Sequence, residues 1–211
     1  VGYRRVMAKR KAPALTHFQH PSFFGYFPSN SQLASVLGDV LSTGLAALGL
    51  SWQSSPALTE LEEVTTDWVR QLLGLTDAWK GVIQDTASTS TLVALVCARE
   101  RASDFALVRD GLQQTAAPLV VYVSAQSHSS VDKAALLAGF GRAHLRVIPT
   151  DIAYAMRPDA LEAAIREDRA AGRRPCAIVG TVGTTTCTAY DPIARLAEIA
   201  RTEGLWLHVD A

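Results

Sequence analysis

The stretch Leu205-Trp206-Leu207-His208-Val209-Asp210-Ala211 closes the chain and decides its fold class. Its apolar run is typical of a buried β-strand, and Asp210 stands where that strand would end. In open α/β sheets, ligands bind beyond the carboxyl ends of the strands. We therefore expect Asp210 to face a ligand crevice and to hold a cationic group of a cofactor.

Composition excludes several classes of partner. The 211 residues include 20 basic and 20 acidic ones and are 48% hydrophobic, which is typical of an ordinary globular chain. Because the net charge is zero and no basic stripe is present, we expect no nucleic-acid partner. No apolar run approaches the roughly 20 residues that span a bilayer, and the basic start lacks the apolar segment of a secretion signal. We therefore expect no membrane partner.

Cysteine and histidine usage indicates the compartment and argues against a metal. Cys97, Cys176 and Cys187 are odd in number and widely spaced, which fits neither a disulfide framework nor a metal site. A reducing cytoplasm is the predicted location. His17 and His20 have a spacing that could bind a metal on a helix, but Pro21 follows directly and no other ligand lies close in sequence. No metal is expected.

The chain changes texture near residue 80. Before it, residues 1–30 are irregular and aromatic, and apolar periodicity predicts helices over 31–50 and 57–75, with Thr59 and Glu62 as a capping box. After it, short β-branched runs alternate with helical stretches, which indicates βαβ units. The predicted strands are 118–123, 145–148, 176–182 and 205–209, and the predicted helices between them are 88–102, 129–138, 158–171 and 192–203.

These elements predict an α/β fold, a mostly parallel sheet with helices on both faces, preceded by an N-terminal helical segment. We expect residues 1–75 to form the N-terminal aromatic and helical segment. Residues 76–211 are expected to form part of a larger α/β domain.

A phosphate-binding helix start is the first chemical feature. Small hydroxyl residues, among them Thr86 and Ser88, precede the apolar helix at residues 92–98. Backbone N–H groups at a helix N-terminus bind anions, and Ser or Thr hydroxyls add to them. Taken alone, the pattern is equally well explained by ordinary helix capping.

Two further segments follow predicted strands. His128 lies in the loop after residues 118–123, where an imidazole can stack on a cofactor ring and pass protons. A capping or hydrogen-bonded loop histidine is the alternative. The segment Gly180-Thr181-Val182-Gly183-Thr184-Thr185-Thr186 offers hydroxyls and close backbone approach at the next strand end.

Pyridoxal phosphate satisfies the whole set. Its phosphate suits the helix start, its ring suits a stacking histidine, and its ring nitrogen suits a carboxylate that keeps it protonated. The protonated ring absorbs the electrons left when CO₂ departs. Asp210 would therefore serve the chemistry as well as the binding.

The chain resembles the group II pyridoxal-phosphate decarboxylases, the aromatic-L-amino-acid decarboxylase family. The matching stretches occur in the family's order over almost the whole chain. They are Thr16-His17-Phe18, Tyr26-Phe27-Pro28, Ser51-Trp52, Ser55-Pro56-Ala57, Thr59-Glu60-Leu61-Glu62, Gly81-Val82-Ile83-Gln84, Thr86-Ala87-Ser88, His128-Ser129-Ser130-Val131, Ala155-Met156-Arg157, Gly183-Thr184-Thr185-Thr186-Cys187 and Trp206-Leu207-His208-Val209-Asp210-Ala211.

The resemblance implies fold type I, a homodimer and a set of site residues. It implies that Ala87 and Ser88 hold the phosphate, that His128 stacks on the ring, and that Thr185 contacts the cofactor. It further implies that Asp210, beside Ala211, pairs with the ring nitrogen, and that His128 and Asp210 are catalytic. The implied substrate residues, which line an aromatic pocket or reach a neighbouring subunit's site, are Phe18, Tyr26, Phe27, Pro28, Leu48 and Leu50.

Departures from the family pattern concern the substrate and the lysine. Phe18, Ser29 and Asp85 differ from residues found in some family members, which leaves the substrate open. The family's Schiff-base lysine follows the Asp-Ala pair by a few tens of residues, and no lysine of this chain matches its motif. We expect the chain to be a fragment of a longer enzyme, inactive by itself and with an unprotected sheet edge.

The expected reaction is decarboxylation of an aromatic L-amino acid to its amine and CO₂. An aromatic aldehyde synthase is the alternative, and His128 favours simple decarboxylation because aldehyde-forming members sometimes replace it. A glutamate or sulfinate decarboxylase is less favoured because residues 16–30 offer no basic partner for a distal anion. A catalytically silent homologue also remains open, whereas nucleotide-binding glycine motifs are absent.

Overall fold

The computed structural model describes residues 16–26, 31–112 and 117–211. The chain divides into two compact units, Val1–Ile83 and Gln84–Ala211, and each is described by itself. None of the helices in the described ranges combines the length and the apolar character that crossing a membrane requires.

The first unit contains two helices, both predicted from apolar periodicity. They are α2 (Leu33–Gly44) and α3 (Pro56–Leu72), and Pro56 occupies the first turn of α3, where its missing N–H is harmless. Neither helix buries a residue in the described structure. Large apolar side chains therefore remain exposed on both, at Leu33, Val36, Leu37, Val40, Leu41, Leu61, Val64, Trp68, Val69 and Leu72.

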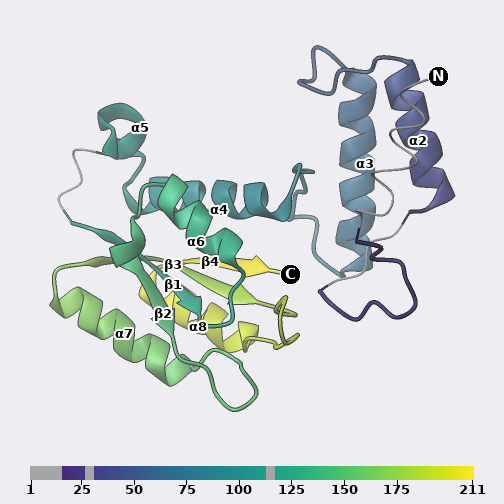
Figure 1. Ribbon diagram of the computed structural model, residues 1–211. Coiled ribbons are helices and arrows are strands. Elements are labelled where there is room, and N and C mark those ends of the chain that lie inside the picture. The colour runs from purple at the N-terminus through teal and green to yellow at the C-terminus, as the bar shows by residue number, and fades with distance from the viewer. Residues whose placement is uncertain (1–15, 27–30, 113–116) are drawn as a thin grey trace, which may run out of the picture. The chain divides into compact units, whose positions relative to one another are not determined.

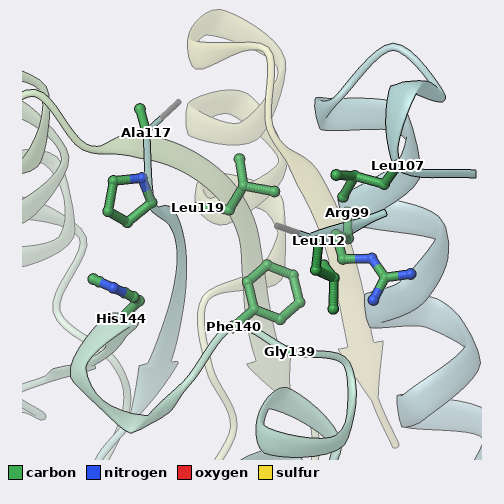
Figure 2. Close-up of a pocket in the computed structure, with 9 residues that line it drawn as sticks. Arg99, Leu107, Leu112, Ala117, Leu119, Gly139, Phe140 and His144 are labelled. Carbon is green, nitrogen blue, oxygen red and sulfur yellow. The ribbon is translucent and has the colours of Figure 1, made fainter. Parts of the chain in front are cut away.

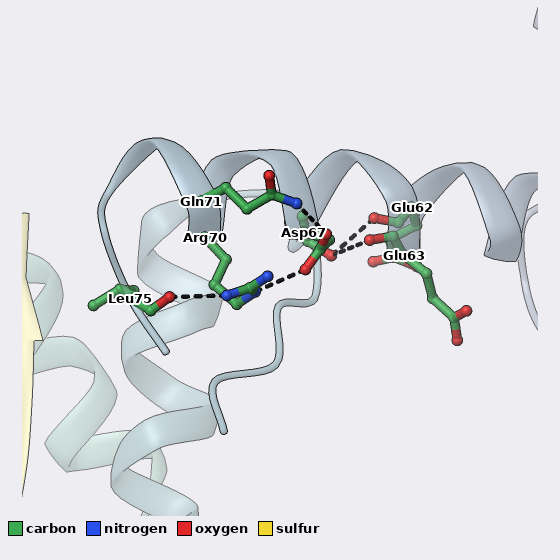
Figure 3. Close-up of polar contacts among 7 residues, drawn as sticks. Glu62, Glu63, Asp67, Arg70, Gln71 and Leu75 are labelled. Carbon is green, nitrogen blue, oxygen red and sulfur yellow. Dashed lines mark hydrogen bonds and ion pairs between the residues drawn. The ribbon is translucent and has the colours of Figure 1, made fainter. Parts of the chain in front are cut away.

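Polar contacts fix the end of α3 (Figure 3). The Asp67 carboxylate accepts hydrogen bonds from Arg70 Nε at 2.7 Å and from Gln71 Nε2 at 2.6 Å. Arg70 also donates to the carbonyl of Leu75 at 2.8 Å, so it joins the helix to the loop that follows.

The predicted capping box in α3 is wrong. The helix starts at Pro56, with Ser55 as its N-cap, and the Thr59 hydroxyl donates to the Ser55 carbonyl from inside the first turns. The Glu62 carboxylate instead accepts from the N–H of Ile83 at 2.6 Å. Glu62 thus holds the last residue of the first unit rather than the start of the helix.

The second unit is a four-stranded parallel sheet in the order β2-β1-β3-β4. The strands are β1 (Leu119–Ser124), β2 (Leu145–Ile148), β3 (Arg174–Thr181) and β4 (Trp206–Asp210). All four were predicted, and β3 begins two residues before the predicted range.

Helices cover both faces of the sheet, as expected (Figure 1). One face packs against α4 (Ala87–Ala102) and α6 (Ser129–Leu137) around a core that includes Leu95, Val121 and Val131. The other packs against α7 (Pro158–Ala170) and α8 (Ile193–Glu203) around Tyr122, Leu161 and Leu196. The α/β prediction is therefore confirmed.

Two details differ from the predictions. The short helix α5 (Ala106–Asp110) and the 3₁₀ turn η3 (Arg142–His144) were not predicted. The expectation of a buried strand over 205–209 is wrong, because β4 lies at an edge of the described sheet and its side chains are half-buried or exposed. Central strands β1 and β3 are the buried ones.

A buried carboxylate ties α7 to the sheet. Asp168 is fully buried and accepts hydrogen bonds from Tyr122 Oη at 2.8 Å and from Arg173 Nε at 2.7 Å. Burial and the neighbouring Asp168 carboxylate raise the pKa of Tyr122, so its phenol stays a donor. The hydrogen bonds of this buried network form only while Asp168, Tyr122 and Arg173 are all present.

We expect Asp168→Ala to lower the free energy of unfolding by about 3 kcal/mol or more, because it leaves a buried phenol and a guanidinium without their partner. Glu167→Gln is the matched control on the same helix. It removes an exposed ion pair with Arg146 and should change stability by less than about 1 kcal/mol. Urea denaturation of both variants tests the contrast, and equal losses would contradict it.

Candidate active site

Three neighbouring strands end at the same edge of the sheet, and the polar residues singled out by sequence follow these ends. Strand β1 ends at Ser124, β3 at Thr181 and β4 at Asp210. Thr181 pairs with Asp210 in the parallel register, and the N–H of Val182 donates to the Asp210 carbonyl at 2.8 Å. The backbone of Asp210 is thereby fixed to the end of β3.

Side-chain alternation along β4 sets the direction of Asp210. Trp206 packs against the α4 and α6 core, whereas Leu207 packs against the α7 and α8 core. Because successive side chains of a strand point to opposite faces, His208 and Asp210 share the face of Trp206. The Asp210 carboxylate therefore belongs to the side of the sheet that α4 and α6 cover.

The first turn of α4 lies at this same edge. At its other end, the carbonyl of Ala102 accepts a hydrogen bond from Arg174, the first residue of β3. Helix α4 therefore runs antiparallel to the strands, and its 16 residues span about 24 Å, enough to bring its start to the carboxyl edge.

The start of α4 has donors for an anion. Thr86 is the N-cap, and its hydroxyl accepts from the N–H of Thr89 at 3.2 Å. The N–H groups of Ala87 and Ser88 occupy the first turn, where a helix offers them no internal acceptor. They can therefore bind a phosphate, aided by the helix dipole.

His128 is the N-cap of α6 and is exposed at the same edge. Its Nδ1 accepts from the N–H of Ser130 at 3.2 Å and lies 2.9 Å from the Ser130 hydroxyl. A neutral imidazole that accepts through Nδ1 carries its proton on Nε2. The capping alternative is therefore confirmed, and it leaves Nε2 and the ring faces available for a ligand.

The loop after β3 carries Thr185. Gly183 has a φ of 77°, in the left-handed region that favours glycine, and its N–H donates to the Ala189 carbonyl. Thr184 is fully buried, and its hydroxyl accepts from the N–H of Ala189 at 2.9 Å. Cys187 Sγ lies 3.7 Å from Gln126 Oε1, which joins this loop to the His128 loop. Thr185 is half-buried on this braced loop.

Two buried polar atoms on the Asp210 face have no partner among the described residues: the hydroxyl of Thr181 and Nε2 of His208. Burial lowers the pKa of His208, and the negative charge of Asp210 only partly opposes this. Native structures seldom leave buried polar groups unpaired. The donors beside Asp210 therefore fit a polar ligand, such as a pyridoxal phosphate held between the α4 terminus and the carboxylate.

The pyridoxal-dependent decarboxylase conserved domain matches residues 6–211. The chain belongs to this family. The resemblance read from the sequence is therefore confirmed, including its assignment to the group II, aromatic-amino-acid branch.

Two relatives are similar in sequence to this chain over 94% of its length. The chain is 44% identical over 207 residues to phenylacetaldehyde synthase of Arabidopsis thaliana, covering 94% of this chain and 41% of that protein. It is 43% identical over 210 residues to aromatic-L-amino-acid decarboxylase of Bos taurus, covering 94% and 42%. The chain thus spans less than half the length of these relatives.

A solved structure supports the fold of this family member. Catharanthus roseus tryptophan decarboxylase, in complex with L-tryptophan, superposes with a TM-score of 0.90 at 38% identity. The superposition covers all of this chain and 46% of that one.

The sequence offers no signal for Asp191, which fixes the backbone at the end of β3. Its buried carboxylate accepts from the N–H of Thr181 at 2.8 Å and from the N–H of Met156 at 2.7 Å. Burial raises the pKa of Asp191, and the two backbone donors oppose that rise. Nothing in the local sequence signals this role, because both partners lie elsewhere in the chain.

The predicted substrate residues belong to the first unit. Phe18 is half-buried and packs on Phe23 with ring centroids 4.7 Å apart, whereas Tyr26, Leu48 and Leu50 are exposed. Phe27 and Pro28 lie outside the described residues. Their place in a substrate pocket stays a prediction.

One cavity of the chain lies away from the carboxyl edge of the sheet (Figure 2). It encloses about 250 Å³ near the amino ends of β1 and β2 and is lined by Arg99, Leu107, Leu112, Ala117, Pro118, Leu119, Gly139, Phe140 and His144. Because it lies at the edge opposite Asp210, it takes no part in the proposed site.

The half-buried His208 predicts a pH dependence of stability. Its folded-state pKa lies below the unfolded value of about 6.5, so the unfolded state binds more protons as the pH falls below 7. His208 should therefore destabilise the full-length protein progressively between pH 7 and pH 5.

We expect His208→Gln to lose less stability than the parent over that range, because glutamine takes up no proton. Thermal unfolding at a series of pH values measures the difference. The exposed His20→Gln is the control and should follow the parent. Parallel curves for parent and His208→Gln would refute the expectation.

Proposed function

We propose that the protein decarboxylates an aromatic L-amino acid to the corresponding amine and CO₂, using pyridoxal 5'-phosphate. The observation that carries the proposal is the Asp210 carboxylate at the edge and on the face where α4 begins. A cationic ring nitrogen and an anionic phosphate need this pair of opposite charges at one edge of the sheet. Membership of the pyridoxal-dependent family supports the same assignment.

We propose that different residues bind different parts of the cofactor. Ala87 and Ser88 donate backbone N–H groups to the phosphate, His128 stacks on the ring, and Thr185 contacts its side. Asp210, followed by Ala211, accepts a hydrogen bond from the protonated ring nitrogen. When bound, pyridoxal phosphate supplies an electron-withdrawing ring that stabilises the carbanion left by departing CO₂.

His128 and Asp210 are the catalytic residues in this proposal. The Asp210 carboxylate favours the protonated form of the ring nitrogen, because an opposite charge stabilises the charged state. The His128 Nε2–H, fixed by the bond between Nδ1 and Ser130, can donate to the carboxylate of the substrate and orient it. Both groups act without moving their backbones, since each caps or ends a regular element.

The substrate class rests on the relatives and on the aromatic segment. The bovine relative is an aromatic-L-amino-acid decarboxylase, and the first unit supplies the proposed pocket residues Phe18, Tyr26, Phe27, Pro28, Leu48 and Leu50. A glutamate or sulfinate substrate stays less favoured because residues 16–30 carry no lysine or arginine for a distal anion.

An aromatic aldehyde synthase is the second candidate. The 44% identity to phenylacetaldehyde synthase favours it directly. The enzyme would then use oxygen to convert the same substrate to an aldehyde. A catalytically silent homologue is the third candidate.

We expect the full-length protein, supplied with pyridoxal phosphate, to release CO₂ and amine from Trp, Tyr, Phe or Dopa in equal amounts. Measuring CO₂, amine, aldehyde and peroxide together separates the candidates. Aldehyde with peroxide in place of amine would establish the synthase. No turnover and no cofactor absorption band would favour the silent homologue.

Replacing the carboxylate tests the electrostatic assignment. Asp210→Asn should lower kcat by at least about a hundredfold, because it removes a fixed charge from a preorganised site. Asp132→Asn, an exposed change in the first turn of α6, is the matched control and should leave kcat unchanged. Normal kcat for Asp210→Asn would contradict the proposed role.

We further propose that the protein is a homodimer in a reducing cytoplasm, with α2 and α3 at the subunit contact. Leu37 and Leu41 are 54% and 65% exposed within the described structure, and exposed apolar patches of this kind mark interaction surfaces. Burying them against a second copy removes this apolar area from water.

We expect the double change Leu37→Glu and Leu41→Glu to convert the full-length dimer to a monomer, as measured by light scattering after gel filtration. Asp39→Lys on the same helix is the control and should stay dimeric. A dimer that survives the double change would place the contact elsewhere.

A further inference from the structure

We propose that Thr181 is a positioning residue for Asp210: when the cofactor is bound, its hydroxyl, which has no partner among the described residues, turns to donate to the carboxylate oxygen that does not face the ring nitrogen. The inference rests on the proposed function. It adds Thr181 to the residues that position the Asp210 carboxylate for the cofactor.

The sheet places Thr181 next to Asp210. The two are register partners in adjacent parallel strands, which lie about 4.8 Å apart. Val179, two residues before Thr181, belongs to the α4 and α6 core, so Thr181 points to the same face as Asp210. A Cβ built on Gly180 would meet Ile193 and Leu196 of α8, which confirms that the residue between them faces the other side.

The backbone of Thr181 is held from both directions. Its N–H donates to Asp191 Oδ2 at 2.8 Å, and its carbonyl accepts from the N–H of Asp191 at 2.9 Å. Because these bonds and the β3 ladder fix the chain, only the side-chain rotamer of Thr181 is left to adjust. A threonine has few such rotamers, so its hydroxyl has a defined reach.

The hydroxyl of Thr181 lacks the partner that its burial calls for. Thr181 is 4% exposed, and Oγ1 has no hydrogen bond within residues 16–26, 31–112 and 117–211. The comparison is Thr184 in the loop that follows β3, which is also buried and whose hydroxyl accepts from the Ala189 N–H. The unpaired hydroxyl is therefore a feature of position 181 and not of the loop as a whole.

A carboxylate can accept both hydrogen bonds at once. It has two oxygens, each with acceptor capacity, so one can face the ring nitrogen while the other takes the hydroxyl proton. A second donor on the far oxygen restricts rotation of the carboxylate. Thr181 would thus orient Asp210 without touching the cofactor.

The experiment compares Thr181→Val and Thr181→Ser in the full-length protein, with two readouts. Valine keeps the shape and removes the unpaired hydroxyl, so the cofactor-free protein should unfold at an equal or slightly higher temperature. Its Kd for pyridoxal phosphate, measured by absorbance titration, should rise about tenfold. Serine keeps the hydroxyl and should bind within about twofold of the parent.

A double-variant cycle tests whether Thr181 acts through Asp210. In an Asp210→Asn background, Thr181→Val should change the Kd by less than about twofold, because the carboxylate that it positions is gone. Thr188→Val is the matched control. Thr188 is exposed in the loop after β3, and its hydroxyl donates to the neighbouring Cys187 carbonyl, so its change should alter neither readout.

The outcomes separate this inference from the proposed function. A parent protein that fails to bind pyridoxal phosphate overturns both. A parent that binds, with Thr181→Val binding equally well, overturns only the role of Thr181. A Thr181→Val protein that is less stable without cofactor, and whose weaker binding persists in the Asp210→Asn background, would assign Thr181 a packing role and also overturn the inference.

Discussion

The site depends on one electrostatic arrangement: a helix start and a strand-terminal carboxylate lie at the same edge and on the same face of a parallel sheet. Parallel order brings the ends of β1, β3 and β4 together, and side-chain alternation directs Asp210 to the face that α4 covers. The antiparallel course of α4 then brings its positive end to that edge. A ligand with an anion at one end and a cation at the other is the natural complement of this geometry.

Most of this framework was predictable from the sequence because it depends on local signals. Apolar periods of two and of 3.6 residues located all four strands and the helices between them, and Asp210 was placed by the run that precedes it. The capping of α3 was mispredicted because Pro56 starts the helix before Thr59, so Glu62 is free to bind the distant Ile83 N–H. Caps depend on where a helix begins, which periodicity fixes only loosely.

The roles of Asp191 and Thr181 could not be predicted, because they arise from contacts across the fold. Asp191 joins the end of β3 to Met156, which lies 35 residues earlier in the chain. The buried Asp168 and the buried Thr181 differ in their hydrogen bonds. The Asp168 oxygens accept from Tyr122 and Arg173, whereas the Thr181 hydroxyl has no hydrogen bond in the described structure. Buried groups with satisfied hydrogen bonds support the fold, whereas the unpaired Thr181 hydroxyl is available to hold the neighbouring Asp210 carboxylate.

The protonation state of the ring nitrogen tests the account most directly. The full-length protein can be loaded with pyridoxal phosphate carrying ¹⁵N in the ring, and its chemical shift recorded by nuclear magnetic resonance at neutral pH. If the Asp210 carboxylate keeps the ring nitrogen protonated, the shift will be that of a pyridinium and will move toward that of neutral pyridine in Asp210→Asn. A neutral-pyridine shift in the parent protein would contradict the account.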